Sequence, residues 1–325
     1  LKGILHKLFL KSDRSGFATQ RPSEESLQDN QSALTQLRLL AAQGDFARLE
    51  MVGRELLLQK PLKYEPIELV VYSLQQAGRL EVSADIAIQA IEYFPASWTL
   101  QFIAGVALKG VGRHKEACQY LRQAIAISPS DRQTLRQLIE TIAMSDGIAP
   151  AASEYAAHCQ RINRPMDVVV APIGTVRDWA QKTGLSLLEA GEVEAIPFKA
   201  PHVWGGCPNA ETVYALSDQP YVAEINDARI FGNSSLILTS DGTVLCDAGG
   251  HPKFGRIVSF AYEKAVLAQQ PGEVLLDFSE FNTREIEVGM MLSGLASNAF
   301  GHWLPEFLPK LQFLQQHPDF VRLPI

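Results

Sequence analysis

The sequence contains few cysteines, no long apolar run and no excess of positive charge. Its four cysteines (Cys118, Cys159, Cys207 and Cys246) never form a CxxC pair. This argues against a clustered zinc site and predicts reduced thiols, as in a cytoplasmic protein. No apolar stretch reaches the ~18 residues that a membrane-spanning helix needs. Because 29 Lys and Arg residues face 36 Asp and Glu residues, a general nucleic-acid binder is not expected.

Two sequence motifs of common enzyme classes are also missing. There is no GxxxxGKS/T phosphate loop and no GxSxG nucleophile elbow, which argues against P-loop nucleotide hydrolases and α/β-hydrolases. What is present is 325 residues, of which 46% are hydrophobic and 20% charged. At ~100–200 residues per domain, this length predicts about two domains, each able to bury a core without disulfides or metals.

The N-terminal segment, residues 1–31, differs from the rest in composition. Residues 1–15 carry a local charge of +3, and their apolar side chains recur at helical spacing (Leu1, Ile4, Leu5, Leu8 and Phe9). One interpretation is a weak peripheral contact of residues 1–11 with an anionic membrane at its cytoplasmic face. The other is a helix end that packs on its own protein. Residues 16–31 are polar and read as a linker.

An internal repeat follows, over residues 32–165. Helical, Ala- and Leu-rich segments are punctuated by a glycine and a proline that each recur at an almost constant interval. These residues are Gly44, Gly78, Gly112 and Gly147, and Pro61, Pro95, Pro129 and Pro165. A helix–turn–helix unit with a period of about 34 residues resembles the tetratricopeptide repeat, and we expect four stacked helix pairs.

The function of these repeats is open at this level. Each unit leaves an apolar face that its neighbour must cover, so the array is expected to form a solenoid. The array either offers a groove to a protein partner or serves as a spacer packed on the next domain.

After residue 165 the pattern changes to an α/β domain over residues 166–325. Residues 166–172 predict a strand and residues 173–190 a helix. Residues 221–247 predict a small antiparallel sheet with a hairpin turn at 240–242. Residues 286–295 predict another strand, and residues 297–316 a partly helical segment.

Chemically informative residues lie near the C-terminal end. His302 and Glu306 are four positions apart, so on a helix they share one face. A carboxylate beside an imidazole raises the pKa of the imidazole and orients the ring for proton transfer or phosphate binding. The alternative is an ordinary surface pair. Trp204, beside two glycines, predicts a sugar-stacking loop or a packed turn.

Two blocks of this domain resemble bacterial glycosyltransferases of family 61, which includes capsular-polysaccharide biosynthesis proteins. The first block is YVAEINDARIFGNSSLILTSDGTVLCD at 221–247, and the second is SNAFGHWLPEFLPKLQFL at 297–314. His302, Trp303, Glu306 and Lys310 fall in the family's His-Trp-Leu-x-Glu-x-Leu-Pro-Arg/Lys-Leu motif. The resemblance covers about residues 219–325.

The resemblance implies the N-terminal, acceptor-side lobe of a GT-B enzyme with inverting chemistry. Such an enzyme uses a nucleotide-sugar donor and a glycan acceptor, with no cofactor and no metal. It places His302 at the donor phosphate or the reacting centre. Glu306 then orients His302, acts as base on an acceptor hydroxyl, or supports the cleft wall. Asn298 and Trp303 are candidate substrate contacts, although Asn298 equally suits a helix cap.

The nucleotide-binding lobe of such an enzyme is not found in this sequence. We therefore expect a transferase fragment, inactive by itself, from a bacterial pathway of surface-polysaccharide synthesis. The alternative is a non-catalytic helical-repeat interaction protein that carries a relic transferase lobe.

Overall fold

The computed structural model describes residues 24–59, 62–185, 187–189, 195–199, 212–216, 221–230, 236–245 and 264–289. The chain divides into two compact units, Leu1–Thr134 and Leu135–Ile325, which are considered separately. The second unit begins inside a helix of the repeat region.

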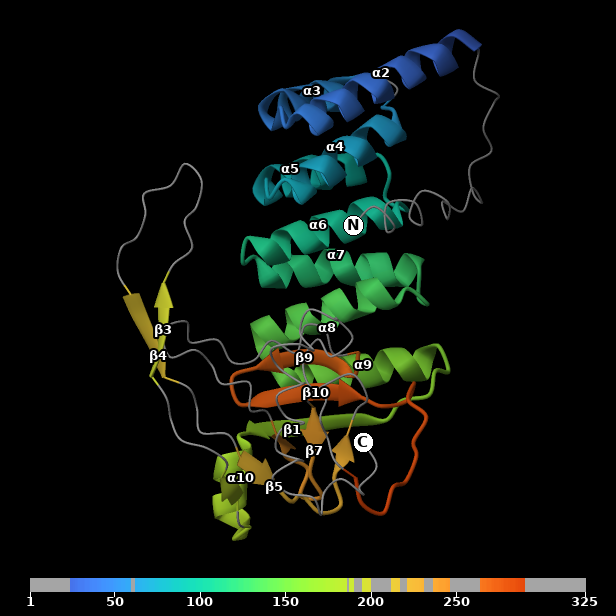
Figure 1. Ribbon diagram of the computed structural model, residues 1–325. Helices are drawn as coiled ribbons and strands as arrows, with labels where there is room; N and C mark the ends of the chain where they lie inside the picture. The colour runs from blue at the N-terminus through green and yellow to red at the C-terminus, as the bar shows by residue number, and fades with distance from the viewer. Residues whose placement is uncertain are drawn as a thin grey trace. The chain divides into compact units, whose positions relative to one another are not determined.

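The first unit is a stack of antiparallel helix pairs (Figure 1). Its helices are α2 (Glu24–Gln43), α3 (Phe46–Leu58), α4 (Tyr64–Gln76), α5 (Leu80–Ile91), α6 (Trp98–Gly110) and α7 (His114–Ile127), and α8 (Arg132–Asp146) crosses the boundary between the units. The described chain thus contains the predicted tetratricopeptide-like helical repeat. One expectation was wrong: residues 24–31, interpreted as linker, belong to α2, whose helical pattern simply continues upstream.

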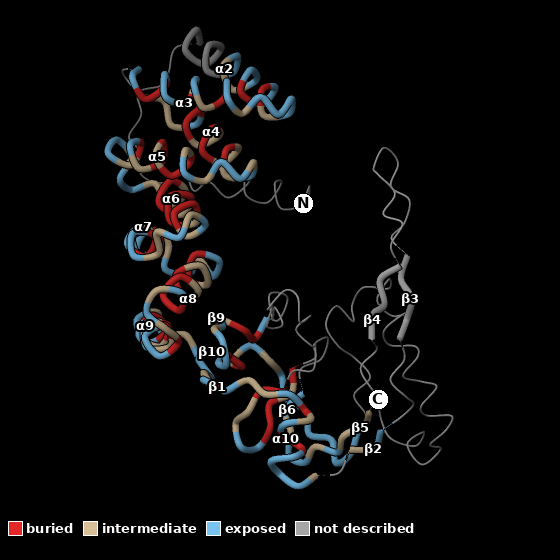
Figure 2. Tube along the Cα trace, turned by 90° about the vertical axis from the view of Figure 1, so that its left-hand side faces the viewer, coloured by how far each residue is buried: buried red, intermediate tan, exposed pale blue. Residues whose placement is uncertain are grey.

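Glycine explains both the turns and the close packing of these pairs. Gly44, Gly78 and Gly112 have φ of 74°, 74° and 82°, a left-handed conformation that other residues rarely adopt. Inside α6, a Cβ added to Gly105 would lie 2.6 Å from Cγ of Leu121 on α7. The repeat spacing therefore places glycine where the chain reverses and where two helices approach closely. Figure 2 shows buried residues along the helix sides that face their neighbours.

The second unit contains a mixed six-stranded sheet. The strand order is β6-β7-β8-β1-β10-β9, and within it only β1 and β8 are parallel. These strands are β1 (Val168–Gly174), β6 (Arg229–Ile230), β7 (Ile237–Leu238), β8 (Val244–Leu245), β9 (Val266–Gln270) and β10 (Glu273–Asp277). Two antiparallel strand pairs accompany it: β2 (Leu187–Glu189) with β5 (Tyr221–Ala223), and β3 (Ala195–Lys199) with β4 (Thr212–Leu216).

Two helices of this unit pack on the sheet. Helix α9 (Ile148–Arg161) contacts β1, β9 and β10, so the last helix of the repeat region packs on the sheet. Helix α10 (Val176–Thr183) follows β1 and packs through Val176 and Trp179 against Leu245 of β8.

The sequence predictions for this unit were right in part. The strand at 166–172 corresponds to β1, and the hairpin at 240–242 joins β7 to β8, with Gly242 at φ 81°. The helix predicted over 173–190 is shorter, because Gly184 ends α10 in a left-handed conformation. The strand predicted over 286–295 is absent from its described part, residues 286–289. The β9–β10 hairpin was missed.

Candidate functional site

The site residues that the sequence suggested cannot be placed. His302, Glu306, Asn298, Trp303 and Trp204 all lie outside the described residues. The same holds for the N-terminal segment, residues 1–23. A candidate site must therefore be built from the side chains that the structure describes.

A set of side chains on α4 and α6 remains at least partly open to solvent. We call it the α4–α6 face; its members are Tyr64, Glu65, Glu68, Tyr72, Trp98, Thr99, Phe102 and Val106. On each helix they recur at intervals of three and four positions, which places them along one side of the helix. The opposite sides of α4 and α6 supply core residues such as Val70 and Ala104.

A hydrogen-bonded chain of polar groups joins the two helices. The hydroxyl of Tyr64 lies 3.0 Å from Oγ of Ser97, which also accepts the backbone N–H of Leu100 and so caps α6. The hydroxyls of Tyr64 and Thr99 hydrogen-bond to Glu68. Ser97 can donate to Tyr64 while Tyr64 donates to the Glu68 carboxylate, and the single hydroxyl proton of Thr99 is shared between Glu68 and Tyr64.

Partial burial changes the acidity of this cluster. Burial raises the pKa of Glu68, and the nearby Glu65 carboxylate raises it further, against the opposing effect of the Thr99 and Tyr64 hydrogen bonds. Burial, followed by the charge of Glu68, also raises the pKa of Tyr64. The Glu68 carboxylate is therefore poorly hydrated. A positive charge placed beside it would stabilise its ionised form.

Aromatic rings flank the polar cluster. Trp98 and Phe102 stack with centroids 5.4 Å apart and planes 13° apart. The indole N–H of Trp98 donates to Oγ1 of Thr134 at 3.0 Å. Tyr64 meets Phe94 edge-on at 5.3 Å. Flat, pre-ordered rings beside a carboxylate can contact the apolar and cationic parts of a side chain with little loss of conformational freedom.

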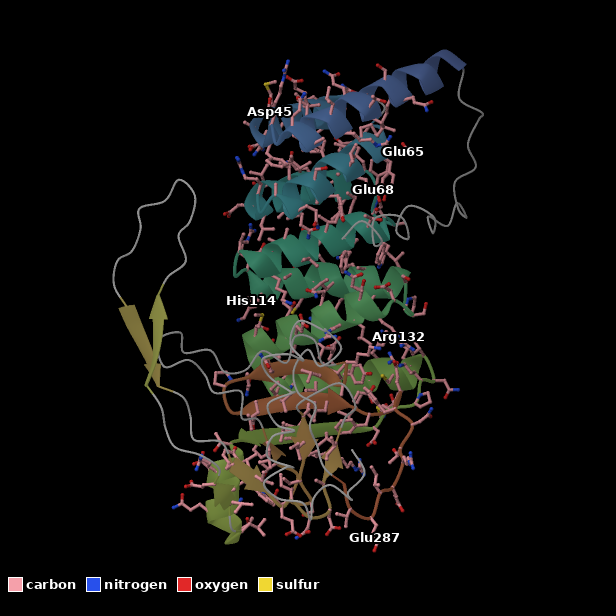
Figure 3. The ribbon with its side chains drawn as sticks, in the orientation of Figure 1. Asp45, Glu65, Glu68, His114, Arg132 and Glu287 are labelled. Carbon is pink, nitrogen blue, oxygen red and sulfur yellow. The ribbon has the colours of Figure 1, made fainter. Side chains whose placement is uncertain are left out.

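Figure 3 shows where the acidic groups of this face lie. Glu65 and Glu68 are at the N-terminal end of α4, whereas Asp45 and His114 are at the other ends of the helix pairs. Asp45 has a structural role, because its carboxylate accepts the backbone N–H of Arg48 at 3.1 Å and caps α3. Glu65 and Glu68 are therefore the acidic groups of the α4–α6 face, and Asp45 is not part of it.

The described residues contain neither a metal-binding cluster nor a membrane-spanning helix. No group of three or more His, Cys, Asp or Glu side chains there is arranged to hold a metal ion. Each helix in the described part is too short or too polar to span a bilayer.

Comparison with known proteins gives a limited result. No family model matches the chain, and no curated protein matches it. Solved structures of MamA are similar in part: MamA from Desulfovibrio magneticus RS-1 is 15% identical, covering 40% of this chain and 74% of its own, with a TM-score of 0.34. MamA AMB-1 is 18% identical, covering 40% of this chain and 78% of its own, with a TM-score of 0.34.

The α4–α6 face was not among the sites predicted from the sequence, although the sequence carries a signal for it. Tyr64 and Trp98 are separated by one repeat period, as are Glu65 and Thr99, and Glu68 and Phe102. The members of each pair therefore occupy equivalent positions of successive repeats. The signal becomes readable once the buried and half-buried sides of each helix are known.

Proposed function

We propose that this chain is a helical-repeat interaction protein whose α4–α6 face binds a segment of a protein partner. The observation that supports it best is the Tyr64–Glu68–Thr99 cluster beside the stacked Trp98 and Phe102. Aromatic side chains are enriched where proteins bind one another, and a partly desolvated carboxylate gives the contact charge specificity. These side chains are ordered by neighbours within the array, so binding loses little side-chain entropy.

Photo-crosslinking in cells tests this proposal. A photoreactive amino acid at position 102 is expected to capture one discrete polypeptide. The same group at position 51 is the control, because Met51 is 51% exposed on α3, outside the proposed face. Capture of the same polypeptide from both positions, or from neither, would contradict the proposal.

A second candidate function is a glycosyltransferase. The observation that favours it is the motif at 297–311, with His302 and Glu306 four positions apart, preceded by the block at 221–247. In this reading His302 stabilises the leaving diphosphate or assists at the reacting centre, and Glu306 orients it or deprotonates the acceptor hydroxyl. Such an enzyme also needs a lobe that binds the nucleotide-sugar donor.

Rates separate this second candidate from the first. In a protein that carries both lobes, His302→Ala should lower sugar transfer from a nucleotide sugar by ~10²–10⁴-fold while the thermal midpoint stays unchanged. Glu306→Gln should also lower the rate of sugar transfer without lowering the thermal midpoint. A lowered thermal midpoint with normal turnover in both variants would refute the catalytic roles of His302 and Glu306. The interaction protein would then remain as the proposed function.

A further inference from the structure

Among the described residues, Glu68 has no positively charged partner. Its carboxylate accepts hydrogen bonds from Tyr64 and Thr99, and the one charged group of this part of the chain that shifts its pKa is the like-charged Glu65. The carboxylate is half-buried, so in its ionised form it lacks both full hydration and a counter-ion. A cation supplied by another molecule would stabilise this ionised form.

Two cationic side chains lie at the same end of the helices without neutralising Glu68. Lys63 is the N-cap residue of α4, and Arg132 is the first residue of α8 (Figure 3). Neither of them contributes to the pKa of Glu68, and Arg132 has contacts of its own. Both would repel a run of basic residues. This end of the face therefore favours a single cation flanked by neutral or acidic groups.

Aromatic rings stand beside the same carboxylate. Thr99, which hydrogen-bonds to Glu68, follows Trp98 directly and precedes Phe102 by about one helical turn. The rings of Trp98 and Phe102 are stacked, and both side chains remain partly open to solvent. Because the indole N–H of Trp98 already donates to Oγ1 of Thr134, this ring is ordered before any ligand arrives.

This arrangement suits arginine better than lysine. A guanidinium is planar, so it can stack on an aromatic ring while its N–H groups hydrogen-bond to a carboxylate. It is also more weakly hydrated than an ammonium group, so moving it to a half-buried position costs less. We propose that the partner of the α4–α6 face places an arginine side chain against Glu68 and the Trp98–Phe102 pair. The partner rests on the proposed function of this face, whereas the arginine subsite can be tested without it.

The test uses the purified full chain and N-acetylarginine amide as the probe. The indole N–H cross-peak of Trp98, assigned with Trp98→Phe, is followed in ¹H–¹⁵N NMR spectra at constant ionic strength. We expect a saturable shift with a dissociation constant in the millimolar range. N-acetylcitrulline amide, which has a similar shape without the charge, should bind at least several-fold more weakly. N-acetyllysine amide should also bind more weakly than the arginine probe.

Two variants locate the subsite on the face. Glu68→Gln removes the charge but keeps an oxygen that accepts the hydrogen bonds of Tyr64 and Thr99. Phe102→Leu removes the stacked ring but keeps an apolar side chain. Each variant should weaken binding of the arginine probe several-fold with little change in thermal midpoint. Glu55→Gln, the same change of charge at an exposed position of α3, should leave the binding unchanged.

Three outcomes would overturn the inference. Equal binding of the arginine and citrulline probes would show that the charge of Glu68 plays no part. Equal binding of the arginine and lysine probes would remove the preference for a guanidinium. No shift of the Trp98 cross-peak, or undiminished binding by Glu68→Gln, would remove the subsite.

Failure of this inference is distinguishable from failure of the proposed function. Capture of a polypeptide from position 102 without binding of the arginine probe would leave the interaction face and remove the arginine subsite. Binding of the probe without capture would leave the subsite and remove the evidence for a protein partner.

Discussion

The hydroxyl of Tyr155 donates a hydrogen bond to the carboxylate of Asp277, joining α9 to β10 inside the second unit. Both side chains are buried, with 1% and 6% of their surfaces exposed. The same carboxylate accepts the backbone N–H groups of Asp167 and Ser279, each at 3.0 Å, and the Ser279 hydroxyl at 3.0 Å. The last helix of the repeat region is thereby a structural part of the sheet unit.

We predict that Tyr155→Phe destabilises the second unit. The variant keeps the ring but leaves the buried carboxylate with one donor fewer, at a cost of about 1–3 kcal/mol. In a unit of this size, each kcal/mol lowers the thermal midpoint by about 2–4 °C. Tyr93→Phe in the first unit is the control and should change the midpoint far less, because Tyr93 is 47% exposed and water can replace a lost partner. Equal effects of the two variants would contradict a special role for Tyr155.

A pH dependence follows from the same carboxylate. Burial alone would raise the pKa of Asp277, but the hydrogen bonds from Tyr155, Asp167 and Ser279 lower it overall. Because the folded pKa lies below the unfolded value of about 4, the stabilisation is complete above that value and is lost as the pH falls through the folded pKa. The neighbouring titratable and charged groups are Tyr155, Cys159 and Arg164.

The prediction concerns Asp277→Asn, which removes the charge with little change of shape. Its thermal midpoint should be clearly below that of the native chain at pH 7, and the difference should shrink as the pH falls below about 4. Differential scanning calorimetry over this range measures it. A difference that stays constant with pH would mean that the charge of Asp277 adds no stability.

Close packing at Gly105 gives a third prediction. A Cβ at this position would lie 2.6 and 2.8 Å from Cγ and Cδ2 of Leu121 and 3.3 Å from the carbonyl oxygen of Ala117. Gly105→Ala should therefore destabilise the first unit by about 1–3 kcal/mol, despite the higher helix propensity of alanine. Leu121→Ala in the same chain should cost less than it does alone, because it removes both crowded carbon atoms of the Leu121 side chain. Strict additivity in urea denaturation would disprove the contact.

The hairpin between β7 and β8 provides a fourth prediction. The Thr239 hydroxyl donates to Asp241 at 2.5 Å, and this bond, helped by Thr243, lowers the pKa of Asp241 to about 2. Thr239→Val removes the donor at similar volume, so the pKa of Asp241 should rise towards its ordinary value. Carbon-detected NMR titration of the Asp241 carboxyl measures this shift directly. An unchanged pKa of Asp241 would mean that other groups of the turn, and not the Thr239 hydroxyl, lower it.

The sequence predicted local features well and distant contacts poorly. The repeat turns were predictable because Gly44, Gly78 and Gly112 stand where the backbone needs positive φ. The Tyr155–Asp277 contact was not, because its partners are 122 residues apart and each resembles an ordinary polar residue in its own segment.

The missed β9–β10 hairpin had a usable signal. The dipeptide Pro271-Gly272 marks its turn, with Gly272 at φ 84°. The flanking strands are short, and the first of them ends in two glutamines, which hides the apolar pattern of a strand. The α4–α6 face was missed for a different reason: the period gives equivalent positions but does not say which side of each helix the core leaves open.

The most direct test of the central claim is the affinity of the face for the partner that crosslinking identifies. Isothermal titration calorimetry with purified proteins should show at least about tenfold weaker binding for Glu65→Lys and for Phe102→Ala, equivalent to about 1.4 kcal/mol. Met51→Ala, outside the face, should leave the affinity within about twofold. An unchanged dissociation constant in both face variants would contradict the claim that α4 and α6 form the binding surface.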